Sequence, residues 1–283
     1  MGTESTFSRE QQVQEEARLA EPLASVSPEK RSKLYGEVYD RIYEMHLERD
    51  PLTLEFGASP ALLGFLEKLT RPGHDTIEVG CGAGLLAVEL ARRGRRVVGV
   101  EVSERILEQA RRRAEDLAGL SLRRTDGTTI PAADGSADFV YSVEVVEHLH
   151  ADDVASHLHE AIRVLRPGGR YWMLTPNRLD SIDSAHRFGV DVAAAADVHL
   201  KEWTYRELAQ EIRAAGFVSL RSPWRNARLL RLPLLPVSWF AAGERLPPAL
   251  LAHRGVRSLL GIVACSIVAT KPRVGGGGAC GRS

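Results

Sequence analysis

The chain has 283 residues, of which 44% are hydrophobic, and its 37 lysines and arginines balance its 37 aspartates and glutamates. This composition supports one sizeable core and excludes a wholly disordered chain. A net charge of zero gives no overall attraction to nucleic acid or anionic lipid, so a partner of either kind would need a local basic patch.

The first 33 residues are polar and lack a steady apolar period. We therefore expect residues 1–33 to be flexible, and they contain no apolar core of a secretory signal. The segment that follows places Tyr35, Tyr39 and Tyr43 four residues apart, which is the spacing of one stripe along a helix. Helices are expected over residues 34–70.

Short β-rich runs then alternate with stretches of helical apolar spacing, the pattern of parallel βαβ units in one α/β sheet. The predicted strands cover residues 76–79, 97–100, 121–124, 139–142, 171–174, 217–220 and 262–269. The predicted helices cover residues 85–93, 104–117, 154–165 and 204–215. A glycine-rich tail over residues 273–283 has no means of packing, and we expect it to be disordered.

The three cysteines, Cys81, Cys265 and Cys280, have neither disulfide nor metal-ligand spacing. A reducing, cytoplasmic location is the simpler interpretation. The longest uncharged apolar stretch, residues 258–270, is shorter than the about 18 residues needed to span a bilayer.

The most informative segment is EVGCGAG at residues 78–84, where a strand enters a glycine-rich turn that opens a helix at Leu85. Glycines at such a turn let a ligand approach the backbone closely. A dinucleotide fingerprint needs its third glycine at the sixth position, which is Leu85 here, whereas glycine falls at the fifth, Gly84. The spacing argues against a pyrophosphate site.

Two carboxylates end the next two strands. Glu101 lies about 20 residues beyond the loop, where an acid can accept hydrogen bonds from ribose hydroxyls. Asp126 follows the third strand, and Gly127 follows Asp126. Either acid alone is more simply a solvated carboxylate or a turn former. Features at three successive strand ends together indicate a ligand site at the carboxyl edge of the sheet.

These motifs, together with LRPGG at residues 165–169, resemble class I S-adenosylmethionine-dependent methyltransferases. The resemblance covers residues 34–271. It implies a Rossmann-like α/β fold with a seven-stranded, mostly parallel sheet, helices on both faces and a late antiparallel strand, for which residues 262–269 are the candidate. The methyltransferase domain would span residues 34–272, and its N-terminal helices, residues 34–70, would form a lid.

The resemblance also implies the cofactor S-adenosylmethionine and its contacts. The glycine loop would lie against the methionine part and Glu78 would support its amino group, while Glu101 would hold the ribose and Asp126 the adenine amino group. The implied cofactor residues are Glu78, Gly80, Cys81, Gly82, Gly84, Glu101, Val102, Ser103, Asp126, Gly127, Ser142 and Val143.

After the fourth strand the sequence reads SVEVVEHL, and in a helical turn Glu144, Glu147 and His148 would share one face. This Glu-x-x-Glu-His pattern resembles ubiquinone-biosynthesis O-methyltransferases and also small-RNA 2′-O-methyltransferases, where a later histidine completes a metal site. His199 is the candidate for that histidine.

The implied metal ligands are Glu144, Glu147, His148 and His199, with Mg²⁺ as the ion, and the candidate catalytic groups are His148, His199 and Glu144. The alternative is that Glu-His only orients the helix in an enzyme without a metal.

Residues 224–251 form an unusually apolar connection whose prolines prevent one long helix. They either bury their own leucines as a subdomain or form an acceptor pocket or a weak membrane-surface contact, with Arg225, Arg228 and Arg231 nearby.

The function we expect is methyl transfer to a small, largely apolar acceptor, with a hydroxyl of a quinone, phenol or polyketide favoured. N- or C-methylation of a metabolite remains open. So do metal-dependent RNA 2′-O-methylation, supported only by the arginines within 92–96 and 111–113, and a non-enzymatic scaffold that binds the cofactor. No nucleic-acid partner is expected. The oligomeric state is not determined by the sequence.

Overall fold

The computed structural model describes residues 9–49, 59–180, 199–224 and 234–273. Its centre is an eight-stranded sheet in the order β3-β2-β1-β4-β5-β8-β6-β7. The strands are β1 (Asp75–Val79), β2 (Arg96–Glu101), β3 (Leu120–Arg124), β4 (Ala137–Val143), β5 (Leu165–Pro176), β6 (Val218–Pro223), β7 (Leu234–Pro236) and β8 (Ala264–Thr270).

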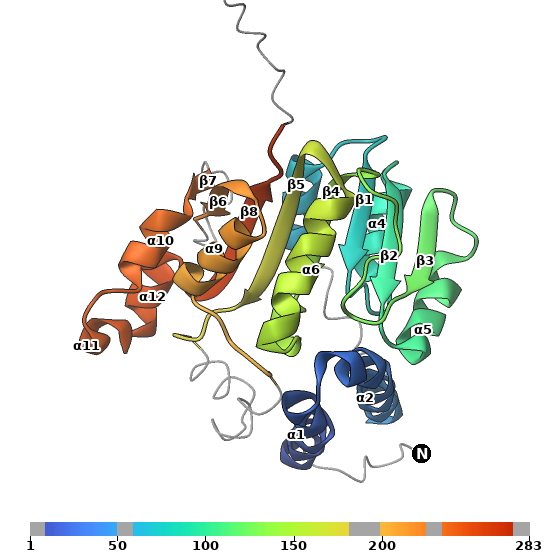
Figure 1. The fold of residues 1–283 in the computed structure, drawn as a ribbon, viewed down its shortest axis with the longest axis horizontal. Helices are drawn as coiled ribbons and strands as arrows, with labels where there is room; N and C mark the ends of the chain where they lie inside the picture. Colours follow the sequence, from blue (N-terminus) through green and yellow to red (C-terminus); the bar gives the residue numbers. More distant parts are fainter. Residues whose placement is uncertain (1–8, 50–58, 181–198, 225–233, 274–283) are drawn as a thin grey trace, which may run out of the picture.

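The helices alternate with these strands as the sequence predicts. They are α1 (Arg9–Ser25), α2 (Pro28–Arg49), α3 (Pro60–Leu69), α4 (Leu85–Arg92), α5 (Glu104–Ala114), α6 (Ala151–Val164), α9 (Tyr205–Ala214), α10 (Val237–Gly243), α11 (Pro248–Leu251) and α12 (Arg254–Leu260). In Figure 1, α6 and α9 lie on one side of the sheet, and α1 and α2 lie beyond its lower edge.

Alternation along the strands places a core on each face of the sheet. Val140 of β4 and Met173 of β5 belong to the cluster that contains the buried residues of α6 and α9. Tyr141 and Trp172, one position along each strand, belong instead to the cluster of α3 and α4. The predicted Rossmann-like sheet with helices on both faces is therefore confirmed.

The sheet has one strand more than the seven we expected. Antiparallel β8 is confirmed close to its predicted position, pairing with both β5 and β6. The additional strand, β7, pairs Leu235 with Ser222 and Pro236 with Arg221 at the far edge. This strand could not be predicted from the sequence because it is only three residues long and ends in proline, a residue that a sheet tolerates at an edge.

The N-terminal segment also differs from expectation, because α1 and the start of α2 are helical where residues 1–33 were predicted to be flexible. Ala20 and Leu23 of α1 are buried, and the Arg31 side chain is only 2% exposed. The Arg31 guanidinium binds the carboxylate of Asp153 on α6 at 2.6 Å. A few apolar contacts and one buried ion pair thus order a mostly polar segment. Residues 1–8 lie outside the described residues.

The apolar connection folds in part into β7, α10 and α11, while residues 225–233, with Arg225, Arg228 and Arg231, lie outside the described residues. Glu244, at the end of α10, accepts hydrogen bonds from the Asn177 side chain at 2.9 Å and the Tyr205 amide at 2.7 Å. Arg257 of α12 binds Asp180 at 2.9 Å. These contacts attach the connection and α12 to the end of β5 and the start of α9.

None of the helices in the described part of the chain combines the length and the apolar character that crossing a bilayer requires.

Candidate active site

A cavity opens at the carboxyl ends of β1, β2 and β4, under α2. Tyr35, Tyr39 and Tyr43 of α2 line one side of it. The other lining residues are Val79, Gly80, Glu101, Val102, Thr125, Gly127, Glu144, Val145, His148 and Leu149. Open α/β sheets bind ligands at this edge, and several of the residues predicted from the sequence meet there.

The glycine loop needs glycines for two physical reasons. Gly80, Gly82 and Gly84 have φ values of 71°, 50° and 76°, in the left-handed region that other residues rarely adopt. A Cβ at Gly80 would lie 2.4 Å from Cγ2 of Val145, and one at Gly84 would lie 2.9 Å from Cβ of Ala110. Gly80 borders the cavity, whereas Gly84 lets α4 and α5 pack closely.

Glu101 lines the cavity and is only 4% exposed. One carboxylate oxygen accepts hydrogen bonds from the amides of Val102 and Ser103, and the other accepts from the amide of Gly82. Burial raises the pKa of Glu101, although these three bonds oppose the rise. A carboxylate offers about four acceptor positions, so one on Oε2 is left for a ribose hydroxyl.

Glu78 lies behind the loop, 4% exposed, and its Oε2 has no hydrogen-bond partner in the described structure. Burial raises its pKa to about 8. An unsatisfied buried carboxylate is costly unless a ligand donor reaches it. Together with the loop and the acceptor position on Glu101, this unsatisfied oxygen fits the amino group and ribose of S-adenosylmethionine.

The remaining predicted cofactor residues divide between the cavity and its support. Val102 and Gly127 line the cavity. Ser103 is fully buried and hydrogen-bonds Asp40 of α2 at 2.5 Å. Oδ1 of Asp126, a residue on the surface, accepts from the backbone and hydroxyls of Thr128 and Thr129. Burial would raise the pKa of Asp126, but these bonds outweigh it and lower the pKa.

Three predicted cofactor residues face the protein interior. Cys81 packs against Leu107 and Ala110 of α5. Ser142 is fully buried and shares a hydrogen bond of 2.7 Å with the hydroxyl of Tyr171. Val143 packs with the core cluster of α3 and α4. None of the three lines the cavity as described, so their side chains support its walls.

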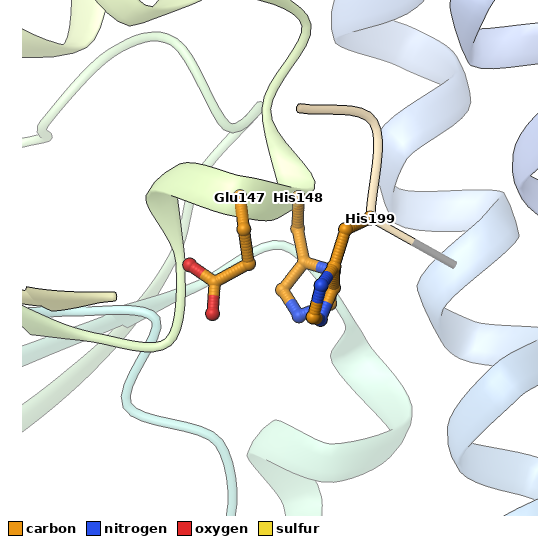
Figure 2. A group of neighbouring side chains, drawn as sticks. All are labelled: Glu147, His148 and His199. Atoms are coloured by element: carbon orange, nitrogen blue, oxygen red, sulfur yellow. The ribbon is translucent and has the colours of Figure 1, made fainter. Parts of the chain in front are cut away.

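A second group of polar side chains lies beside the cavity. Glu147 and His148 come from the 3₁₀ turn Val146–His148 after β4, and His199 comes from the segment before α9. Figure 2 shows the two imidazoles side by side, with the Glu147 carboxylate on the same side of the turn. One ligand atom from each residue lies within 4.8 Å of the other two, so the group could hold a metal ion.

Glu144 does not join this group, contrary to the expected helical face. Its backbone has φ 53°, so the chain turns sharply there and the 3₁₀ turn begins only at Val146. Glu144 lines the cavity instead. Glu144 remains a candidate to contact the acceptor but is not part of the clustered ligand set.

Burial controls the charge of Glu147, which is fully buried. Its Oε2 accepts a hydrogen bond from the Thr175 hydroxyl at 2.9 Å, and its Oε1 has no hydrogen-bond partner among the described residues. Desolvation raises the pKa of Glu147 to about 7, a rise that the nearby His199 opposes. A cation or a proton is therefore favoured at Oε1.

Sequence reasoning missed the residues that hold His199 in place. Nδ1 of His199 lies 2.9 Å from Oε1 of Glu202, and the amide of Lys201 donates to the carbonyl of Glu147 at 3.2 Å. Burial would lower the pKa of His199, but the Glu202 hydrogen bond and the carboxylates of Glu147 and Glu144 raise it. An acid three residues after the histidine was the available signal for Glu202.

The cavity, the glycine loop and the sheet order define a class I, Rossmann-like methyltransferase fold. Residues 77–173 match the family model described as "Methyltransferase domain". The chain contains a class I S-adenosylmethionine-dependent methyltransferase domain, which confirms the resemblance to this class that the sequence motifs indicate.

Two curated relatives support this assignment, and one solved structure shares the fold. A protein of Mycolicibacterium smegmatis named a probable S-adenosylmethionine-dependent methyltransferase is 34% identical over 51% of this chain and 52% of its own. The ubiquinone biosynthesis O-methyltransferase of Methylocella silvestris is 44% identical over 55% of this chain and 66% of its own. A solved S-adenosylmethionine-dependent methyltransferase of Thermotoga maritima shares the fold, with TM-score 0.54, 21% identity and coverage of 82% and 98%.

The chain thus spans between about half and two thirds of the length of these two curated relatives.

Proposed function

We propose that the protein is an enzyme that transfers the methyl group of S-adenosylmethionine to a hydroxyl of a small, largely apolar acceptor. The observation that carries this proposal is the position of His148, which lines the same cavity as Gly80 and Glu101. A candidate base thus stands beside the predicted cofactor site. The bound cofactor would supply an electrophilic methyl group on a positively charged sulfur.

The cavity supports such a reaction through its charge and its walls. Glu101 and Glu144 line it, Glu147 lies next to it, and these acids favour a cationic ligand. The tyrosines of α2 supply an apolar and aromatic side for the acceptor. Holding acceptor oxygen, methyl carbon and sulfur in line provides much of the rate by removing orientational freedom.

Deprotonation is the task we assign to the histidines. The imidazole of His148 would take the hydroxyl proton of the acceptor, whose oxygen would receive the methyl group that the cofactor supplies. The His199 ring lies 5.0 Å from the His148 ring between centroids, and Glu202 supports the protonated form of His199. A phenol with a pKa near 10 needs such a base at neutral pH.

A metal ion is the second candidate for activating the hydroxyl, favoured by the convergence of Glu147, His148 and His199. Two imidazoles and one carboxylate suit Zn²⁺ or another transition metal better than Mg²⁺, which prefers oxygen ligands. The Glu202 contact at Nδ1 would leave Nε2 of His199 as the ligand atom, as outer-sphere carboxylates do in zinc sites. We therefore replace Mg²⁺ by Zn²⁺ in the proposal.

RNA methylation is the weaker enzymatic alternative. Most of the arginines that suggested it form ion pairs with acids of the same surface. The pairs are Arg92 and Arg93 with Glu89, Arg96 with Asp75, Arg111 with Glu104, and Arg112 with Glu108. Arg95 is buried against Thr70. This pairing leaves little local positive charge for a phosphate backbone.

Other expectations remain proposals as well. Cys81 and Cys265 are buried free thiols, in keeping with a reducing, cytoplasmic compartment. A weak membrane-surface contact through residues 224–251 would use side chains such as Trp239, which is 70% exposed.

The test of the enzymatic proposal is mass spectrometry of small-molecule extracts incubated with the protein and cofactor carrying a labelled methyl group. A labelled product that fails to form with His148→Ala supports it. Binding of S-adenosylhomocysteine without any labelled product across broad extracts would favour the scaffold instead.

For the metal, calorimetric titration of the chelated protein with zinc should show one site that is lost in His199→Ala and weakened in Glu202→Gln. Full activity after chelation, with no zinc binding, would leave the imidazoles as simple bases.

A further inference from the structure

A second cavity lies at the amino ends of β1, β4 and β5, on the opposite side of the sheet from the carboxyl ends that form the candidate active site. It is bounded by the end of α3, the approach to β1, the first residues of β4 and the start of β5, and its volume is about 480 Å³. Small-molecule sites commonly enclose about 300–1,000 Å³. The lining residues are Lys68, Leu69, Thr70, Arg71, His74, Asp138, Arg166, Pro167, Gly168, Gly169 and Arg170.

The lining of this cavity is strongly cationic, because it contains one lysine and three arginines but only one carboxylate, that of Asp138. Within this set, Arg166 forms ion pairs with Asp138 at 3.0 Å and with Asp75 at 2.8 Å. Arg273 adds a further guanidinium at the rim, because its Nε would lie 3.3 Å from a Cβ built on Gly168. The chain as a whole is neutral, so this concentration of positive charge is local.

Two of these arginines have no carboxylate partner within the described residues. Arg170 is half-buried and donates a hydrogen bond to the carbonyl of Leu69, and burial lowers its pKa. Arg71 is exposed, and no ion pair to an acid is found for it in residues 9–49, 59–180, 199–224 or 234–273. A partly desolvated guanidinium without a counter-ion is unfavourable unless an anion binds it.

His74 adds a buried donor to the same wall. Its Nδ1 is inaccessible to solvent and has no hydrogen-bond partner in the described structure. Burial lowers the pKa of His74, and the charges of Arg71 and Arg170 add to that effect against the opposing carboxylate of Asp138. These surroundings favour the neutral imidazole, which can still donate one hydrogen bond from a ring nitrogen.

We propose that this cavity binds the phosphate group of a small molecule, held by Arg71, Arg170 and Lys68 with His74 as an additional donor. Forked guanidinium groups match the oxygens of phosphate, and their excess over carboxylates supplies the charge that such a ligand needs. The site is separate from the proposed methyl-transfer site, because the two cavities share no lining residue.

The experiment is calorimetric titration of the full chain with inorganic phosphate and, separately, with pyrophosphate, at constant ionic strength set with chloride. We expect saturable binding that raises the melting temperature. Arg71→Ala should weaken binding about tenfold, because it removes one charge-assisted contact without removing a contact of the fold. Tighter binding of pyrophosphate would identify a diphosphate-bearing ligand, and equal binding would identify a single phosphate.

Arg112→Ala is the matched control, since Arg112 is an exposed arginine on α5, with 70% of its side chain exposed. It should leave phosphate affinity unchanged. Arg170→Lys keeps the positive charge but removes the planar guanidinium that can donate two parallel hydrogen bonds, so this variant should bind phosphate several-fold more weakly. Absence of saturable binding, or equal weakening in Arg71→Ala and Arg112→Ala, would overturn the proposal. Affinity for S-adenosylhomocysteine should be the same in all three variants, so this result is independent of the proposed methyl transfer.

Discussion

Replacing Glu147 by glutamine should change how the stability of the protein depends on pH. Burial raises the pKa of this carboxyl from 4.5 to about 7. A pKa raised by folding means that the protonated form is favoured in the native state. The contribution of the Glu147 carboxyl to stability is therefore fully present below pH 4.5 and is lost as the pH rises through about 7.

The magnitude follows from the two pKa values. At pH 8 the ionised carboxylate costs about 3 kcal/mol relative to a group that stays neutral, and at pH 5 it costs about 1 kcal/mol. Glu147→Gln removes this charge and keeps an oxygen that can accept the Thr175 hydrogen bond. Any cost of burying the amide is the same at both pH values. Measured relative to the wild type, the free energy of unfolding of the variant should thus increase by about 2 to 3 kcal/mol from pH 5 to pH 8.

The assay is urea unfolding of the metal-free protein at several pH values, with the same slope expected for both proteins. Glu108→Gln, at an exposed position of α5, is the control and should show no such trend. A stability difference between Glu147→Gln and the wild type that does not change with pH would refute the desolvation argument. Zinc added in excess should reverse the order of stability, because only the wild type keeps the carboxylate ligand.

Three further predictions follow from the geometry. Glu101→Gln should weaken binding of S-adenosylhomocysteine about tenfold or more by calorimetry, since it removes the charged acceptor at the ribose position, and unchanged affinity would disprove that assignment. Gly80→Ala should abolish cofactor binding because the added methyl group has no room, whereas Gly64→Ala, with nothing within 4 Å, should leave binding intact in the same titration. Arg31→Met should lower the free energy of unfolding by about 3 to 5 kcal/mol in urea, because it leaves the buried Asp153 without its cationic partner and with only the Tyr35 hydroxyl as a side-chain donor; a loss below 1 kcal/mol would mean that water replaces the guanidinium.

Local sequence patterns were sufficient for the α/β sheet and for the position of the cavity at the carboxyl ends of its strands. Strands and helices of regular length alternate, and this alternation forces parallel neighbours whose carboxyl ends meet at one edge. Gly80, Glu101 and Gly127 were predicted because each ends a strand or lies within three residues after a strand end. The capping box of Thr204 and Glu207 at the start of α9 is an equally local feature, because the two residues lie three positions apart.

Tertiary structure decided what depends on contacts between distant segments. The order of residues 9–33 depends on Arg31 meeting Asp153, which is 122 positions away in the chain. The turn at Glu144 removed that residue from the ligand group, and the segment before α9 brought His199 to Glu147. Spacing along the chain describes the neighbours of a residue within one element, but it does not fix the meeting of side chains from different elements.

The charge of the protein shows the same division between what the sequence determines and what the fold determines. The neutral total charge is a property of the sequence and argues against a general affinity for polyanions. Only the folded chain separates that charge into a carboxylate-lined cavity at one edge of the sheet and an arginine-lined cavity at the other. Folding brings together charges that are scattered along the sequence, and electrostatic attraction acts over distances in space.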